Sequence, residues 1–191
     1  MSLGWANQLN QLLTGAGLRF IDCPVTGGQW GAEDGTLTLL VGADEAVLEE
    51  ARPVLDAISS KIIHFGPAGA GTGFKLLYNL MGATQQTALA EGLLTAEKLG
   101  LKMDSVVEGL TSGFTGSPGV HAFAQRMVDS DHDHVNFSAH WMRKDTAYAV
   151  KMAGELGQAI PLSGVSAQMY QLAVTRGLGN KNMSAIIEAY R

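Results

Sequence analysis

The longest uninterrupted helical pattern in the chain constrains its fold more than any other feature. Residues 71–101 contain no proline, and apolar side chains recur there with the period of an α-helix. Such a helix would be about 45 Å long at 1.5 Å per residue, which is typical of a central helix that others surround. The sequence therefore predicts an all-α domain around this helix. The shorter helical segments that follow, separated by glycine and proline, are 104–112, 118–129, 140–156, 162–177 and 183–190.

The first part of the chain alternates instead between helical and extended patterns. Three short strands at the start of a chain do not complete an open α/β sheet, so we interpret this block as the closing part of a larger one. We place the domain boundary between residues 68 and 69, with an α/β domain over 1–68 and an all-helical domain over 69–191. The predicted helices are 5–13 and 44–58, and the predicted strands are 18–25, 36–42 and 61–66.

Composition excludes several classes of protein. The 191 residues include 13 Lys and Arg against 18 Asp and Glu, with no basic run, which argues against nucleic acid or an anionic membrane as a partner. No apolar run approaches the ~18 residues that span a bilayer, and the N-terminus lacks a secretory signal. We therefore expect a cytoplasmic protein. A single cysteine, Cys23, excludes an intrachain disulfide and a zinc site built from several cysteines.

The glycine-rich segment 66–73 does not match either of the common nucleotide-binding motifs. A P-loop ends in Gly-Lys-Ser/Thr, whereas Gly71 is followed by Thr72. A dinucleotide fingerprint needs GxGxxG, but the glycines here are spaced two apart and Phe74 follows the last of them. By itself, the chain contains no recognisable nucleotide site.

Lys75 and Asn79 are four residues apart in the predicted long helix, so their side chains lie on one face. A cation beside an amide can hold a polar substrate and move a proton, although many such pairs are solvated surface residues. The apolar neighbours leave little solvent-facing helix here, which favours the functional interpretation. Those neighbours are Phe74, Leu76, Leu77, Tyr78 and Leu80.

Thr26, Gly27 and Gly28 follow the end of a predicted strand. A hydroxyl followed by two unencumbered backbone N–H groups makes a small anion-binding nest suited to a carboxylate. An ordinary glycine turn is the alternative.

Two other polar segments carry weaker signals. Lys144 and Asp145 are neighbours in a predicted helix, and such a pair is usually a solvated surface pair. Residues 131–134, Asp-His-Asp-His, resemble a metal cluster, but histidines two apart suit no usual zinc spacing. We predict a solvated acidic loop there and no metal site, and we expect Cys23 to be a core residue.

Three segments together resemble the β-hydroxyacid dehydrogenases, the relatives of 3-hydroxyisobutyrate dehydrogenase and 2-hydroxy-3-oxopropionate reductase. The segments are IDCPVTGGQWGAEDGTLTLLVGAD, HFGPAGAGTGFKLLYNLM and FSAHWMRKDTAYAV, the last followed by AIPLSGVSAQMY. The resemblance runs from about residue 5 to the C-terminus. It implies an α/β remnant of a Rossmann sheet followed by an all-α C-terminal domain built around a long central helix. In that family a GxGxxG loop precedes the part that this chain covers, so we interpret the chain as a fragment and the leading Met-Ser-Leu as a cloning remnant.

The resemblance also implies roles for individual residues. Lys75 matches the catalytic lysine of the family, and Asn79 matches an amide that binds substrate. Lys144 matches a lysine near the nicotinamide cofactor, NAD or NADP, and Phe137 matches an aromatic residue near the substrate. Thr26, Gly27 and Gly28 match a Ser-Gly-Gly that holds the substrate carboxylate. Cys23 stands where alanine is common, and Asn182 stands where aspartate is often seen.

Two functions remain open from the sequence. The first is an NAD(P)-dependent oxidoreductase, active as a homodimer or homotetramer, that interconverts a small 3-hydroxy acid and its semialdehyde or oxo acid. Lys75 is the general acid/base in this hypothesis. The resemblance implies alcohol and aldehyde chemistry and not imine reduction, because imine-reducing relatives commonly have Asp or Tyr at the position of Lys75. The second is a non-catalytic module for dimerisation and substrate binding, which the missing phosphate-binding glycines support. We expect the chain alone to turn over poorly or not at all.

Overall fold

The computed structural model describes all residues from Met1 to Arg191. The chain forms two compact units. Unit 1 comprises Met1–Tyr78 with Lys151–Gln158, and unit 2 comprises Asn79–Val150 with Ala159–Arg191. The domain boundary between residues 68 and 69 stays a prediction from the sequence.

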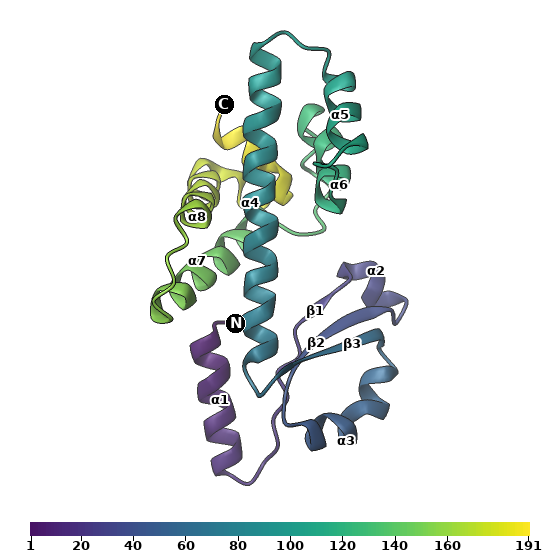
Figure 1. The fold of residues 1–191 in the computed structure, drawn as a ribbon, viewed down its shortest axis with the longest axis vertical. Helices are drawn as coiled ribbons and strands as arrows, with labels where there is room; N and C mark the ends of the chain where they lie inside the picture. The colour runs from purple at the N-terminus through teal and green to yellow at the C-terminus, as the bar shows by residue number, and fades with distance from the viewer. The chain divides into compact units, whose positions relative to one another are not determined.

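Unit 1 contains a three-stranded sheet in the order β1-β2-β3 (Figure 1). β2 and β3 are parallel and joined by helix α3, whereas β1 is antiparallel to β2. β2 is buried along nearly its whole length, as is usual for a strand of a parallel sheet. The elements are α1 (Leu3–Gly15), β1 (Val25–Thr26), α2 (Gly28–Glu33), β2 (Leu37–Gly42), α3 (Glu45–Asp56) and β3 (Ser59–Gly66).

Two predictions in unit 1 are wrong in detail. The strand expected over 18–25 shrinks to Val25–Thr26 and an isolated bridge between Asp22 and Gly42. Pro24 interrupts the ladder because it has no N–H to donate. Between Thr26 and β2, where the sequence predicts no helix, the chain forms the six-residue helix α2. A helix this short gives no periodic signal.

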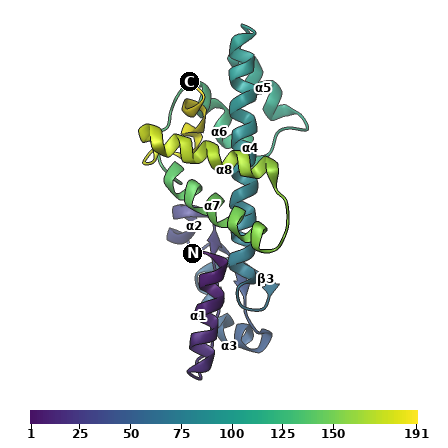
Figure 2. The same cartoon turned by 90° about the vertical axis from the view of Figure 1, so that its left-hand side faces the viewer.

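Unit 2 is helical. In Figure 1, α5 and α6 lie on one side of α4 and α8 lies on the opposite side; Figure 2 shows α8 crossing α4. The predicted helix over 162–177 ends as an α-helix at Ala173 and continues as a π-helix, which contains Gly177 at φ 82°. The elements are α4 (Ala70–Lys98), α5 (Met103–Ser112), α6 (Pro118–Val128), α7 (Ala139–Glu155), α8 (Pro161–Ala173), the π-helix η1 (Val174–Leu178) and the 3₁₀-helix η2 (Met183–Ala189).

The core of unit 2 forms where one face of α4 meets the surrounding helices. Leu93 and Ala90 of α4 are fully buried there, as are Tyr170 of α8 and Ile186 of η2. Removal of apolar surface from water stabilises a fold by ~25 cal/mol per Å², so this cluster stabilises unit 2.

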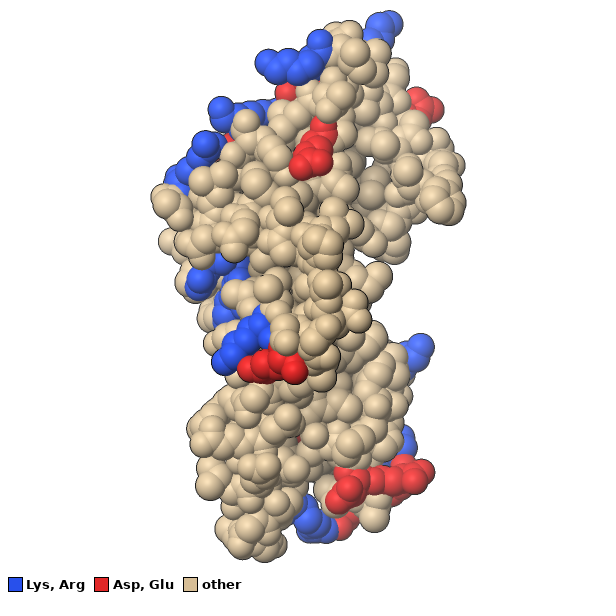
Figure 3. All heavy atoms as spheres, turned by 60° about the vertical axis from the view of Figure 1, so that its left-hand side comes forward, with Lys and Arg blue, Asp and Glu red and all other residues tan.

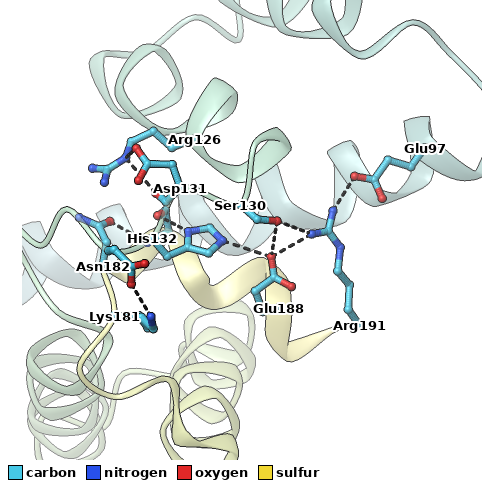
Figure 4. Close-up of polar contacts among 11 residues, drawn as sticks. Glu97, Arg126, Ser130, Asp131, His132, Lys181, Asn182, Glu188 and Arg191 are labelled. Carbon is cyan, nitrogen blue, oxygen red and sulfur yellow. Dashed lines mark hydrogen bonds and ion pairs between the residues drawn. The ribbon is translucent and has the colours of Figure 1, made fainter.

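Hydrogen bonds fasten the C-terminal segment to the loop that precedes α7 (Figure 4). The fully buried Asn182 donates from its side chain to Asn136 Oδ1 at 2.7 Å and from its backbone to the carbonyl of His132 at 2.8 Å. The ring of His132 contacts Ser184 Oγ at 2.9 Å and Glu188 Oε1 at 3.2 Å. Only 6% of His132 is exposed, so the prediction of a solvated loop is wrong at this residue.

Charged side chains are sparse on the face drawn in Figure 3, where they lie mainly near the edges. No helix is both long enough and apolar enough to cross a bilayer. No group of three or more His, Cys, Asp or Glu side chains is arranged to hold a metal ion.

Candidate functional site

The proposed proton-transfer residue, Lys75, lies in the second turn of α4 and is half-buried. Its ammonium nitrogen is 5.0 Å from the centroid of the Tyr78 ring, within the range of a cation–π contact. Phe74, the preceding residue, stacks on Phe65 of β3 with the ring centroids 4.0 Å apart. The stacked pair anchors this turn of α4 to the end of the sheet.

The expectation that the helix around Lys75 has little solvent-facing surface is wrong. Leu77 is 48% exposed, Tyr78 is 49% exposed and Met81 is 65% exposed. Leu76 and Leu80 occupy the buried face instead. The sequence does not distinguish the two faces because both carry apolar side chains.

The turn at residues 26–28 has the backbone geometry of a glycine-dependent turn. Gly27 has φ 122° and Gly28 has φ 64°, both in the left-handed region that side chains disfavour. Thr26 is half-buried, and both glycines are exposed. The turn therefore leaves two glycine backbones at the surface, beside one hydroxyl.

A buried polar cluster in unit 2 joins two of the predicted site residues. Asn79 Nδ2 donates to Asp145 Oδ2 at 2.6 Å, and Lys144 Nζ lies 2.7 Å from Asp145 Oδ1. Asn79 is 6% exposed and Asp145 is 7% exposed. The ammonium of Lys144 is also 5.2 Å from the centroid of the Trp141 ring and 5.7 Å from that of Tyr148. The carboxylate of Asp145 thus holds both the amide of Asn79 and the ammonium of Lys144 in place.

Asp145 is a further member of this cluster that the sequence does not single out. The sequence predicts a solvated surface pair with Lys144, yet the carboxylate of Asp145 is buried and uses both oxygens. A signal was available, because Met142, Thr146 and Ala149 mark the buried face of α7 and Asp145 shares that face by helical spacing. A carboxylate on the apolar face of a helix needs partners.

Phe137 lies in the loop before α7 and packs against the core of unit 2 while half-buried. Its carbonyl accepts a hydrogen bond from the backbone of Met183 at 2.8 Å. The C-terminal segment, which also contacts His132, therefore supports the position of this aromatic residue.

Cys23 packs against the small core of unit 1. Burial, and secondarily the negative charge of Asp22, raises the pKa of its thiol. A raised pKa reduces the thiolate fraction at neutral pH, which agrees with a core role and opposes a nucleophilic one.

Comparisons with known proteins identify the class. Residues 69–190 match the family described as the NAD-binding domain of NADP-dependent 3-hydroxyisobutyrate dehydrogenase. Residues 1–66 match the NAD-binding domain of 6-phosphogluconate dehydrogenase. The chain belongs to the β-hydroxyacid dehydrogenase family, as its sequence motifs predict.

Particular relatives agree with this assignment. The chain is 34% identical over 174 residues to 2-(hydroxymethyl)glutarate dehydrogenase of Eubacterium barkeri, a match over 91% of this chain and 58% of that protein. It is 36% identical over 171 residues to a probable 3-hydroxyisobutyrate dehydrogenase of Mycobacterium tuberculosis, over 86% of this chain and 58% of that protein. The chain thus spans about three fifths of the length of these curated relatives.

Solved structures show the same likeness. The structure of 3-hydroxyisobutyrate dehydrogenase of Mycobacterium tuberculosis with L-serine is 34% identical and superposes with a TM-score of 0.91 over 100% of this chain and 67% of that chain. The Salmonella typhimurium 3-hydroxyisobutyrate dehydrogenase is 27% identical, with a TM-score of 0.87 over 98% of this chain and 66% of that chain.

Proposed function

We propose that this chain carries the hydroxyacid-binding and proton-transfer groups of an NAD(P)-dependent oxidoreductase. The enzyme would interconvert a small 3-hydroxy acid and its semialdehyde or oxo acid. The observation that carries the proposal is the cluster of Asn79, Asp145 and Lys144. In it, one carboxylate binds the two residues to which the family resemblance gives roles in the site. Membership of the dehydrogenase family gives this cluster its chemical context.

Lys75 is the proposed general acid/base. In the direction of reduction its ammonium gives a proton to the carbonyl oxygen of the substrate; in oxidation the neutral amine takes the hydroxyl proton. A lysine at its ordinary pKa of about 10.4 is neutral only about once in 2,500 molecules at pH 7. At neutral pH the protein is therefore expected to favour reduction unless its surroundings stabilise the neutral amine.

The turn formed by Thr26, Gly27 and Gly28 is proposed to bind the substrate carboxylate. Its hydroxyl and its surface N–H groups are donors suited to a carboxylate oxygen. Asn79 would donate to a substrate oxygen, and Phe137 would provide an apolar surface against the carbon chain. The substrate class follows from these groups: a small molecule with one carboxylate and one hydroxyl or carbonyl.

The nicotinamide of NAD or NADP would supply the hydride when bound. The residues present fit one end of such a cofactor: Lys144, held by Asp145, lies between Trp141 and Tyr148 and offers a cation and aromatic surfaces. The chain has no GxGxxG turn for the pyrophosphate. We therefore assign Lys144 to cofactor binding and expect cofactor affinity to be low in the chain alone.

Calorimetry separates this proposal from the non-catalytic module. The chain is titrated with NADH and with NADPH, each in the presence and absence of 3-hydroxyisobutyrate, and Lys144→Ala serves as the matched control. Saturable heat that the control lacks supports a cofactor site. Heat on adding 3-hydroxyisobutyrate alone, with none from either dinucleotide, would favour the binding module.

We also propose that the chain forms a homodimer or homotetramer through α8. Leu162 and Val165, one helical turn apart, are 70% and 58% exposed. Exposed apolar side chains at that spacing are typical of an interface helix. Light scattering on the wild type and on Leu162→Lys tests this proposal, because the substitution should shift the mass toward the monomer.

A further inference from the structure

We propose that Asp22 is a positioning residue for Lys75: its buried carboxylate fixes the first turn of α4 and so places the lysine one turn further along. The inference rests on the proposed role of Lys75. It concerns unit 1 alone, since residues 1–78 belong to that unit.

The carboxylate of Asp22 is committed entirely to backbone donors. Gly69 N donates to Asp22 Oδ1 at 2.6 Å, and Thr72 N donates to Asp22 Oδ2 at 2.5 Å. The first N–H groups of a helix have no partner within the helix, and the helix dipole favours a negative charge there. Asp22 is 2% exposed, so water competes little for these bonds. The carboxylate therefore holds the start of α4 through two hydrogen bonds, from Gly69 N and Thr72 N, which we call the clamp.

The backbone of Asp22 is fixed as firmly as its side chain. Asp22 N donates to the carbonyl of Gly42 at 3.0 Å, and Gly42 N donates back to the carbonyl of Asp22 at 2.9 Å. Gly42 is the last residue of β2. A single residue thus links the end of a buried strand to the start of the helix that carries Lys75.

The end of β2 and the first turn of α4 are closely packed. A Cβ on Gly42 would lie 2.2 Å from Asp22 Oδ1, and a Cβ on Gly71 would lie 2.2 Å from the carbonyl oxygen of Leu40. Real Cβ atoms do not approach so closely, so the strand end and the first turn of α4 fit together only with glycine at both positions. The helix cannot shift along the sheet without breaking the clamp.

Lys75 follows Thr72 by three residues and Gly71 by four, so it lies on the same side of α4, about 4.5 Å and about 6 Å further along the axis. Asp22 also precedes Thr26 by four residues, and Thr26 pairs with Thr38 of β2. The turn at 26–28 and Lys75 are therefore both held in position relative to β2. For Lys75 the connection runs through Asp22. A displaced clamp would move Lys75 and leave the turn at 26–28 in place.

Nuclear magnetic resonance of the whole chain tests the inference without requiring turnover. The Cγ signal of Asp22 and the Cε signal of Lys75 are followed as the pH is lowered. We expect the Lys75 signal to report the same acid transition as Asp22, because protonation removes one acceptor of the clamp. A Lys75 signal that does not change through the Asp22 transition would overturn the proposal.

A substitution provides the second readout. Asp22→Asn keeps the shape of the side chain but places an amide NH₂ against a backbone donor. We expect Gly69 and Thr72 to exchange their amide hydrogens at least about tenfold faster, and the titration midpoint and Cε shift of Lys75 to change. Ser117→Ala is the control, since Ser117 Oγ caps α6 at 3.2 Å from Val120 N in unit 2. Its loss weakens a helix cap and should leave the Lys75 signals unchanged.

If Asp22→Asn accelerates exchange and Lys75 nevertheless titrates as in the wild type, Asp22 is only a helix cap and the proposal is wrong. Failure of the proposed function looks different. It would appear as absence of turnover and of cofactor binding, while the Lys75 signals would still show whether Asp22 positions that residue.

Discussion

The two buried aspartates of the molecule perform different structural tasks. Asp22 in unit 1 accepts hydrogen bonds only from backbone N–H groups, at Gly69 and Thr72. Asp145 in unit 2 contacts only side chains in the bonds described, those of Asn79 and Lys144. The first carboxylate fixes the first turn of a helix, whereas the second orients individual polar groups within the proposed site. The burial of a carboxylate therefore does not indicate whether it binds backbone groups or side chains.

The largest expected effect on the free energy of unfolding comes from crowding at the contact between Asp22 and Gly42. Gly42→Ala would place a methyl group 2.2 Å from Asp22 Oδ1 and 2.7 Å from Gly71 N. Overpacking of this kind costs about 3 kcal/mol of unfolding free energy, measured by urea denaturation. Gly92→Ala in α4 is the control, because its Cβ would meet nothing within 4 Å. Removing a helical glycine there should stabilise by about 1 kcal/mol. Equal effects at the two glycines would show that the junction at Asp22 is not crowded.

Removing the side chain of Asp145 should have the next largest effect. Asp145→Ala leaves the Asn79 amide buried without its acceptor and Lys144 without its counter-ion, at a cost of about 2 kcal/mol. Asp145→Asn keeps an acceptor for Asn79 and should cost about 1 kcal/mol. Urea unfolding of both variants gives the comparison. If Asp145→Asn were as unstable as Asp145→Ala, the charge of Asp145 and not its hydrogen bond to Asn79 would be the important feature.

The smallest expected effect distinguishes the electrostatic surroundings of the two aspartates. The pKa of the Cys23 thiol is raised by burial and, second, by the charge of Asp22. Asp22→Asn removes the second cause, so at pH 8 the thiolate fraction and the rate of reaction with iodoacetamide should rise. Asp145→Asn should leave this rate unchanged. A rate in Asp22→Asn equal to that of the wild type would mean that burial alone protects the thiol.

The sequence predicted best where a regular pattern extends over many residues. The periodicity over 71–101 corresponds to α4 at Ala70–Lys98, and the β-favouring run at 36–42 corresponds to β2 at Leu37–Gly42. The short elements were misjudged because two paired residues at β1 or six residues at α2 show no period. Local pattern thus suffices for long elements and fails for brief ones.

The buried polar residues were misjudged for a different reason. The partners of Asp145 and His132 lie far away in sequence, 66 residues from Asp145 to Asn79 and 52 residues from His132 to Ser184. Helical spacing can place Asp145 on the buried face of α7, but no local pattern identifies the partner of either residue. Helical spacing predicted Lys75 and Asn79 as site residues, and the family resemblance gave them roles and added Lys144. The structure added the carboxylate that holds Asn79 and Lys144.

The proposed function depends most on Lys75 as the group that exchanges a proton with the substrate. The most direct measurement is turnover of 3-hydroxyisobutyrate with NAD and NADP, comparing the wild type with Lys75→Ala. The chain itself is used if it turns over; otherwise it is joined to the part of the Mycobacterium tuberculosis relative that it does not cover. We predict that kcat falls at least about 100-fold, with the dissociation constant of the cofactor unchanged within about twofold. Retention of wild-type kcat by Lys75→Ala would contradict the account.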